Sequence, residues 1–176
     1  MNILIPLTDG FEEIEATVAL DVLRRAGLNV VTAGIPSSML TGANGMKVTT
    51  DRKFEDVRAE DFDALVLVGG PGYKNLANSN KVLSTVREFD SKGKTIAAIC
   101  MAPSILAKAG IINDKKATIY PGQERQIPRP RGERVVVDDN IITSQAPGTA
   151  IEFSLKIVEK LVGKDKANRI KRDLVC

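Results

Sequence analysis

The chain has 176 residues, of which 43% are hydrophobic and 27% are charged, and its formal net charge is +3. This length suits one compact domain with a large core, so we expect a single domain over residues 1–176. The small net charge, with no basic stripe interleaved with aromatic residues, argues against nucleic-acid binding. No apolar run approaches the ~20 residues that span a bilayer, so no membrane partner is expected.

The chain holds two cysteines, Cys100 and Cys176, which lie far apart in the sequence. Such spacing makes neither a disulfide framework nor a metal site, and no metal is expected. The N-terminus begins at once with a strand-like run, residues 2–5, and lacks a basic leader segment. These features predict a cytoplasmic protein. Cys176 is the last residue, and we interpret it as a tail thiol without a role.

Hydrophobic periodicity predicts alternating strands and helices, which is typical of an α/β fold with a mostly parallel sheet and helices on both faces. In chain order we expect strand 3–7, helix 12–25, strand 29–33, loop 36–45, a small antiparallel excursion over 46–50, strand 64–68, helix 80–92, strand 95–99, helix 101–110, a short strand 117–120, paired strands 135–138 and 141–144, helix 149–162 and a short helical tail 164–172.

Two details of the helices are also predicted. Ile14, Val18 and Val22 recur at helical spacing and should form the core stripe of the first helix. Thr149 and Glu152 have the spacing of a capping box, which would begin the helix that Gly163 ends.

The candidate nucleophile is Cys100, which follows a short apolar strand and precedes a helix with Pro103 in its first turn. A cysteine at a helix entrance faces unpaired N–H groups and the positive end of the dipole, which lowers a thiol pKa from about 8.5 toward roughly 3.5–7.5. The alternative is a buried structural cysteine, which packs as a small hydrophobe. Because the chain contains no histidine, Cys100 would act without an imidazole base.

Other residues should meet Cys100 at the carboxyl ends of the strands, where ligands bind in doubly wound sheets. Gly69 and Gly70 follow a buried strand, and a backbone N–H there could pair with that of Met101 as an oxyanion hole. The same glycines could simply serve a tight turn. Glu15, in the first helix, either complements the helix dipole or points inward, where burial near a thiolate would keep it protonated.

Four arginines and two prolines lie between Gln123 and Arg134. This segment is either a solvated loop or an anion-attracting rim over the cleft.

Five segments together resemble the ThiJ/PfpI superfamily, in particular its Parkinsonism-associated deglycase-like branch. The resemblance covers nearly the whole chain, and the segments that carry it are 9–15, 21–27, 68–70, 97–103 and 143–149. It implies a flavodoxin-like three-layer sandwich that pairs as a homodimer. It also implies that Cys100 is the elbow cysteine, that Glu15 hydrogen-bonds it, and that Gly70 and Met101 supply the oxyanion-hole amides.

One position departs from the family pattern, because Tyr120 precedes Pro121 where many members carry a histidine. A Cys-His peptidase mechanism is therefore disfavoured. Tyr120 could donate a hydrogen bond to a bound carbonyl or could be a packing residue; with a free pKa near 10 it is a poor base.

Two functions of different classes follow. The first is a cofactor-independent enzyme that acts on reactive dicarbonyls or their adducts with proteins and amines, with Cys100 as nucleophile and Glu15 as acid/base. The second is a redox-sensing or stress-protective, chaperone-like protein in which Cys100 is oxidised to sulfinic acid.

Overall fold

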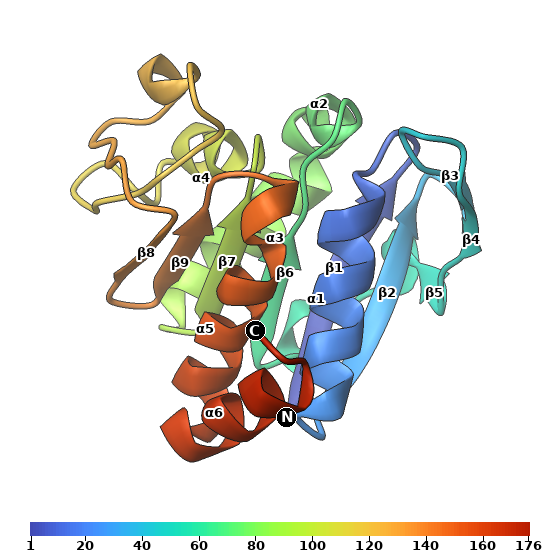
Figure 1. The fold of residues 1–176 in the computed structure, drawn as a ribbon. Helices are drawn as coiled ribbons and strands as arrows, with labels where there is room; N and C mark the ends of the chain where they lie inside the picture. The colour runs from blue at the N-terminus through green and yellow to red at the C-terminus, as the bar shows by residue number, and fades with distance from the viewer.

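The computed structural model describes all residues from 1 to 176 and contains a seven-stranded sheet at its centre (Figure 1). The strand order is β5-β2-β1-β6-β7-β9-β8, and every neighbouring pair is parallel except β8 with β9. The strands of this sheet are β1 (Asn2–Thr8), β2 (Asn29–Ile35), β5 (Arg52–Lys53), β6 (Ala64–Leu67), β7 (Thr95–Ile99), β8 (Val135–Asp138) and β9 (Ile141–Ser144).

Helices cover both faces of the sheet (Figure 1). On one face lie α1 (Glu13–Arg25), α5 (Ala150–Val162) and α6 (Lys164–Asp173), and on the other lie α2 (Tyr73–Asn78), α3 (Asn80–Ser91) and α4 (Pro103–Ala109). The predicted flavodoxin-like three-layer sandwich is therefore confirmed. No helix has both the length and the apolar character needed to cross a membrane.

The central strands are buried on both sides because each alternates its side chains between two cores. In β7, Ala97 and Ile99 belong to the core beneath α1 and α5, whereas Ile96 and Ala98 belong to the core beneath α3 and α4. Each core contains 25 buried residues, so neither face of the sheet is left open. Continuous apolar runs in the sequence thus became central strands, as predicted.

The predicted strand 117–120 is absent. Only one isolated bridge, between Ala117 and Pro130, forms there. The place beside β7 is taken by β9, so this segment does not pair with β7. The N–H of Thr118 donates instead to the side-chain hydroxyl of Thr143 at 2.9 Å.

The small antiparallel excursion is confirmed as β4 (Lys47–Thr49), but its partner β3 (Met39–Thr41) lies in the segment predicted as loop. Strand β5 and helix α2 were also not predicted. All three are short, and their sequences carry little periodicity from which to recognise them.

The predicted capping box at the start of α5 is wrong. No side chain caps this helix. The Thr149 hydroxyl lies 2.6 Å from that of Ser144, and Glu152 pairs with Arg134 at 3.0 Å. Thr149 and Glu152 thus contact Ser144 of β9 and Arg134 of the loop before β8, and they do not form a capping box with each other.

Candidate active site

Cys100 occupies the sharp turn between β7 and α4 and has a positive φ of 64°. A residue with a side chain reaches this region at a cost of roughly 1–3 kcal/mol, and neighbouring structure must hold it there. The N–H of Cys100 donates to the carbonyl of Ser144, and its carbonyl accepts from the N–H of Tyr120, both at 3.0 Å. Its side chain is 6% exposed. The turn therefore presents a largely buried thiol in a fixed position.

Glycines in the turn after β6 let the backbone approach this thiol. A Cβ placed on Gly69 would lie 2.7 Å from the Cys100 Cβ and 3.0 Å from its sulfur. Gly70 has a φ of +86°, and a Cβ there would lie 2.5 Å from the Glu12 nitrogen. Both glycines are required by close backbone packing as well as by the turn, so the two interpretations made from the sequence are compatible.

Glu15 lies on α1 beneath this turn and is completely buried. Its Oε2 accepts a 2.7 Å hydrogen bond from the N–H of Gly69, whereas its Oε1 is buried without a partner. The predicted core stripe of the helix is partly wrong, because Ile14 is 52% exposed and Glu15 faces inward instead. The carboxyl side chain of Glu15 thus lies on the buried face of the helix, where the periodicity had placed the side chain of Ile14.

Burial raises the pKa of Glu15 to about 7, and repulsion from Glu12 adds to this. The hydrogen bond from the Gly69 amide and the neighbouring Cys100 thiol oppose the rise but do not cancel it. A carboxyl group in this position carries its proton over much of the physiological range and can act as an acid or a base there.

Burial also raises the pKa of Cys100, to about 12, and the negative charge of Glu15 contributes. The amides of Gly70 and Met101 face the sulfur and act in the opposite direction. The lowered thiol pKa expected from the helix entrance is therefore wrong. Desolvation and a like charge outweigh the field of a short helix that begins only at Pro103.

Cys100 and Glu15 are best described as one titrating pair. The first proton leaves near pH 7, and the second leaves only far above it. A singly charged pair can hold its remaining proton on sulfur or on the carboxyl group. When the carboxyl holds it, the sulfur is a thiolate that faces two amides and a neutral acid.

The thiol opens into a cavity of about 440 Å³. Its lining contains the predicted residues Gly70, Cys100, Met101 and Tyr120, together with Pro71, Tyr73, Lys74 and Gln123. The last four were not predicted as site residues. Their position after the glycine turn of β6 and in the loop after Tyr120, both at the carboxyl edge of the sheet, is the feature that could have identified them.

Tyr120 is 44% exposed, and its hydroxyl makes no hydrogen bond within the chain. The nearby arginine-rich segment contributes Gln123 to this cavity but none of its arginines, which agrees with a solvated loop and not with a rim over the cysteine. Cys176 is exposed at the end of the chain and is not part of this cavity. No group of three or more metal-binding side chains is found.

Comparison with known proteins assigns the chain to a family. A model described as the DJ-1/PfpI family matches residues 1–160. The chain therefore belongs to the DJ-1/PfpI family, as the sequence resemblance indicated. Its sequence is 39% identical to protein DJ-1beta of Drosophila melanogaster over 98% of this chain and 95% of that protein.

Named relatives and solved structures agree with this assignment. A glutathione-independent glyoxalase of Caenorhabditis elegans is 36% identical over 98% of this chain and 94% of its own length. A deglycase of Pyrococcus abyssi is 32% identical over 92% and 99%, respectively. The crystal structure of Drosophila DJ-1beta superposes with a TM-score of 0.94, covering 99% of this chain and 97% of that chain. Oxidised Toxoplasma gondii DJ-1, at 34% identity, gives a TM-score of 0.95 with the same coverage.

Proposed function

We propose that this protein is a cysteine-dependent enzyme that acts on reactive dicarbonyls or on their adducts with proteins and amines, without a bound cofactor. The observation that carries the proposal is the buried Cys100–Glu15 pair at the base of an open cavity. The relatives named glyoxalase and deglycase support the same substrate class.

The first step is addition. The Cys100 thiolate forms a C–S bond to the aldehyde carbon of a 2-oxoaldehyde, and the carbonyl electron pair moves to oxygen. The amides of Gly70 and Met101, which already face the sulfur, stabilise this oxyanion. The oxyanion then takes the proton of the Glu15 carboxyl, which gives a hemithioacetal.

The second step moves a proton between two carbons. The Glu15 carboxylate removes the proton from the former aldehyde carbon, which gives an enediol, and returns it to the neighbouring carbon. The hydroxyl proton of the hemithioacetal passes to the neighbouring oxygen, and the product is the thioester of a 2-hydroxy acid. Water then cleaves the thioester. No external oxidant is consumed, because one carbon is oxidised as the other is reduced. With an amino adduct, the same carboxyl group protonates the departing amine.

A Cys-His peptidase mechanism remains disfavoured because the chain contains no histidine. In an assembly of identical copies, no partner could supply one. Tyr120 lines the cavity and can donate a hydrogen bond to a bound carbonyl oxygen.

The test is consumption of methylglyoxal with formation of lactate by wild type, Cys100→Ser and Glu15→Gln. We expect Cys100→Ser to be inactive and Glu15→Gln to lose about 10²-fold or more of kcat, the usual size of a general acid–base contribution. Cys176→Ser is the matched control and should keep full activity, since Cys176 lies outside the cavity. Activity that survives in Cys100→Ser would refute the proposal.

A second candidate function is redox sensing, in which peroxide oxidises Cys100 to sulfenic and then sulfinic acid with release of two waters. It is favoured by the unpartnered Glu15 Oε1, which can donate a hydrogen bond to an oxidised sulfur when protonated. Intact mass after mild peroxide should gain two oxygens in wild type and in Cys176→Ser, but not in Cys100→Ser. Equal oxidation of both cysteines would contradict a sensor at Cys100.

We also propose that the chain acts as one domain and assembles as a homodimer in the cytoplasm. Exposed Ile14 and Met46 offer apolar surface for a second copy. The two free thiols suit a reducing compartment. Sedimentation equilibrium of wild type and of Ile14→Glu tests the assembly, and a monomeric wild type would contradict it.

A further inference from the structure

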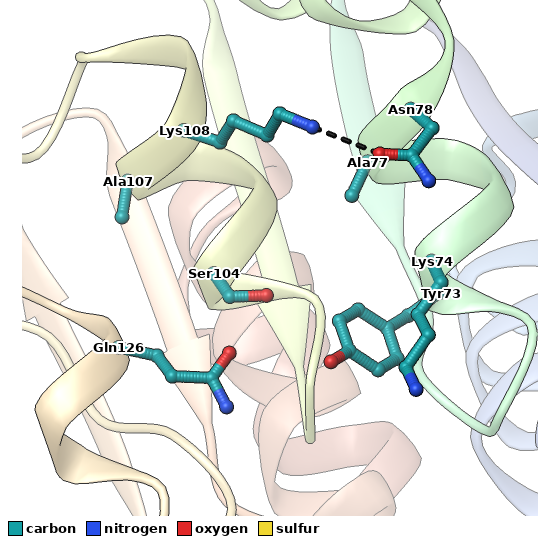
Figure 2. Close-up of a pocket in the computed structure, with 8 residues that line it drawn as sticks. All are labelled: Tyr73, Lys74, Ala77, Asn78, Ser104, Ala107, Lys108 and Gln126. Atoms are coloured by element: carbon teal, nitrogen blue, oxygen red, sulfur yellow. Dashed lines mark hydrogen bonds between the residues drawn. The ribbon is translucent and has the colours of Figure 1, made fainter.

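A second cavity lies beside the cysteine cavity, between α2 and α4 (Figure 2). It has a volume of about 650 Å³. Its lining residues are Tyr73, Lys74, Ala77, Asn78, Ser104, Ala107, Lys108 and Gln126. Tyr73 and Lys74 line both cavities, so the two adjoin at these residues, and together they are called the groove, with Cys100 at one end.

The groove carries positive charge only. Its two charged lining residues are Lys74 and Lys108, and no carboxylate side chain lines either cavity. A concave surface lined by one sign of charge concentrates ligands of the opposite sign. The groove therefore favours anionic ligands over neutral ones of the same shape.

The two lysines differ in the hydrogen bonds that they make. Lys108 donates a 2.9 Å hydrogen bond to the Asn78 side chain across the groove (Figure 2). Lys74, at the junction of the cavities, makes no hydrogen bond or ion pair, and neither does the Tyr73 hydroxyl beside it. Figure 2 shows the Tyr73 hydroxyl and the polar ends of Ser104 and Gln126 turned toward the same opening. Lys74 is thus the cation that is free to meet a ligand.

Resting on the proposed function, we infer that the groove is a specificity subsite for substrates with a carboxylate several bonds from the reacting carbonyl, and that Lys74 is the residue that selects them. The free ammonium pairs with the carboxylate, and the Tyr73 hydroxyl donates a second hydrogen bond. Methylglyoxal, with three carbons, fills only the end of the groove at Cys100. Larger 2-oxoaldehydes, or adducts that retain an amino-acid carboxylate, extend along it.

The experiment compares two phenylglyoxals, one with a para carboxylate and the other with a para carboxamide, which match in size and differ in charge. Wild type should favour the carboxylate by about fivefold in kcat/KM, the upper range for a solvent-exposed ion pair. The preference should fall toward unity between about 50 mM and 1 M salt, because screening weakens exposed charge pairs.

Variants of Lys74 test its role through this ratio. Lys74→Gln should bring the ratio close to one, Lys74→Glu should invert it, and Lys74→Arg should retain it. Lys116→Gln is the control, because Lys116 is an exposed lysine that lines neither cavity. It should leave the ratio unchanged.

The outcomes separate the subsite from the reaction itself. If wild type consumes both compounds with dependence on Cys100 but shows no preference, or if Lys74→Gln leaves the ratio unaltered, the subsite is refuted and the proposed function stands. A Lys74→Gln variant that loses both activities equally also refutes selection by charge. If neither compound is consumed with dependence on Cys100, the proposed function fails and this inference fails with it.

Discussion

At the scale of single residues, the site depends on one shared proton. Cys100 and Glu15 are both buried, and burial raises the pKa of each, while the charge of Glu15 raises the pKa of Cys100 further. Because the pair loses its first proton near pH 7, thiolate reactivity should follow the titration of the carboxyl group and not that of an isolated thiol. A carboxylic acid whose titration is coupled to that of the sulfur thus stands in place of the missing imidazole.

This coupling predicts the pH dependence of alkylation. In wild type, the rate at which iodoacetamide modifies Cys100 should rise only about twofold between pH 7 and 9, because the first ionisation is already half complete at pH 7. In Glu15→Gln, the thiol titrates alone with a pKa still raised by burial, and the rate should rise more than about tenfold. Both measurements should be made on proteins that also carry Cys176→Ser, so that iodoacetamide can modify only Cys100. Identical profiles would contradict the coupling.

At the scale of elements, two turns and helix α1 meet at the carboxyl edge of the sheet. The turn after β6 packs on the β7–α4 turn through Gly69, and the same glycine donates its N–H to Glu15 of α1. Three elements far apart in sequence therefore position one thiol. The close contact leaves no room for a side chain at Gly69.

A substitution at Gly69 tests this packing. Gly69→Ala should lower the free energy of unfolding by about 1–3 kcal/mol, as overpacking does, because the new Cβ would lie 2.7 Å from that of Cys100. It should also slow alkylation of Cys100 by displacing it from the amides. The matched control is Gly132→Ala, where a Cβ meets nothing within 4 Å and φ is not positive. It should alter stability by less than about 0.5 kcal/mol. The measurements are urea denaturation and iodoacetamide kinetics.

At the scale of the whole molecule, buried and exposed carboxyl groups act on stability in opposite directions. Glu15 has a folded-state pKa above its unfolded value, so its stabilising effect is complete at low pH and is lost as pH rises through about 7. The pKa of Asp51 is shifted the other way. Burial alone would raise it, but the hydrogen bonds from Thr32 and the charge of Arg24 lower it, so this group stabilises at higher pH and its contribution is lost in acid.

Stability should therefore be greatest near pH 5 and should fall by about 2–3 kcal/mol between pH 5 and 8 through Glu15 alone. Glu15→Gln should flatten this decline, since the amide does not titrate. Glu133→Gln, at an exposed position, should retain it. Urea unfolding at pH 5, 6, 7 and 8 measures the slope, and a wild type as stable at pH 8 as at pH 5 would contradict a buried, proton-binding Glu15.

Much of this architecture could be predicted from local sequence, but the strand expected over 117–120 could not. Residues 64–67 and 95–99 are continuous apolar runs, and only a strand covered on both faces suits them. Residues 117–120 have similar strand propensity, yet they lie where β9 already occupies the neighbouring position. Propensity describes what a segment can form, and the partners beside it in the fold decide whether it does.

The sequence by itself determined the α/β class, the position of Cys100 at a strand-to-helix junction and the absence of a histidine base. Those properties depend on residue order and composition alone. Only the tertiary structure decided that Glu15 faces inward in place of Ile14, that the thiol pKa is raised and not lowered, and that Lys74 lies beside the cysteine cavity. Each of these features depends on desolvation and on distances between elements that are remote in sequence. Local periodicity carries no information about desolvation or about such distances.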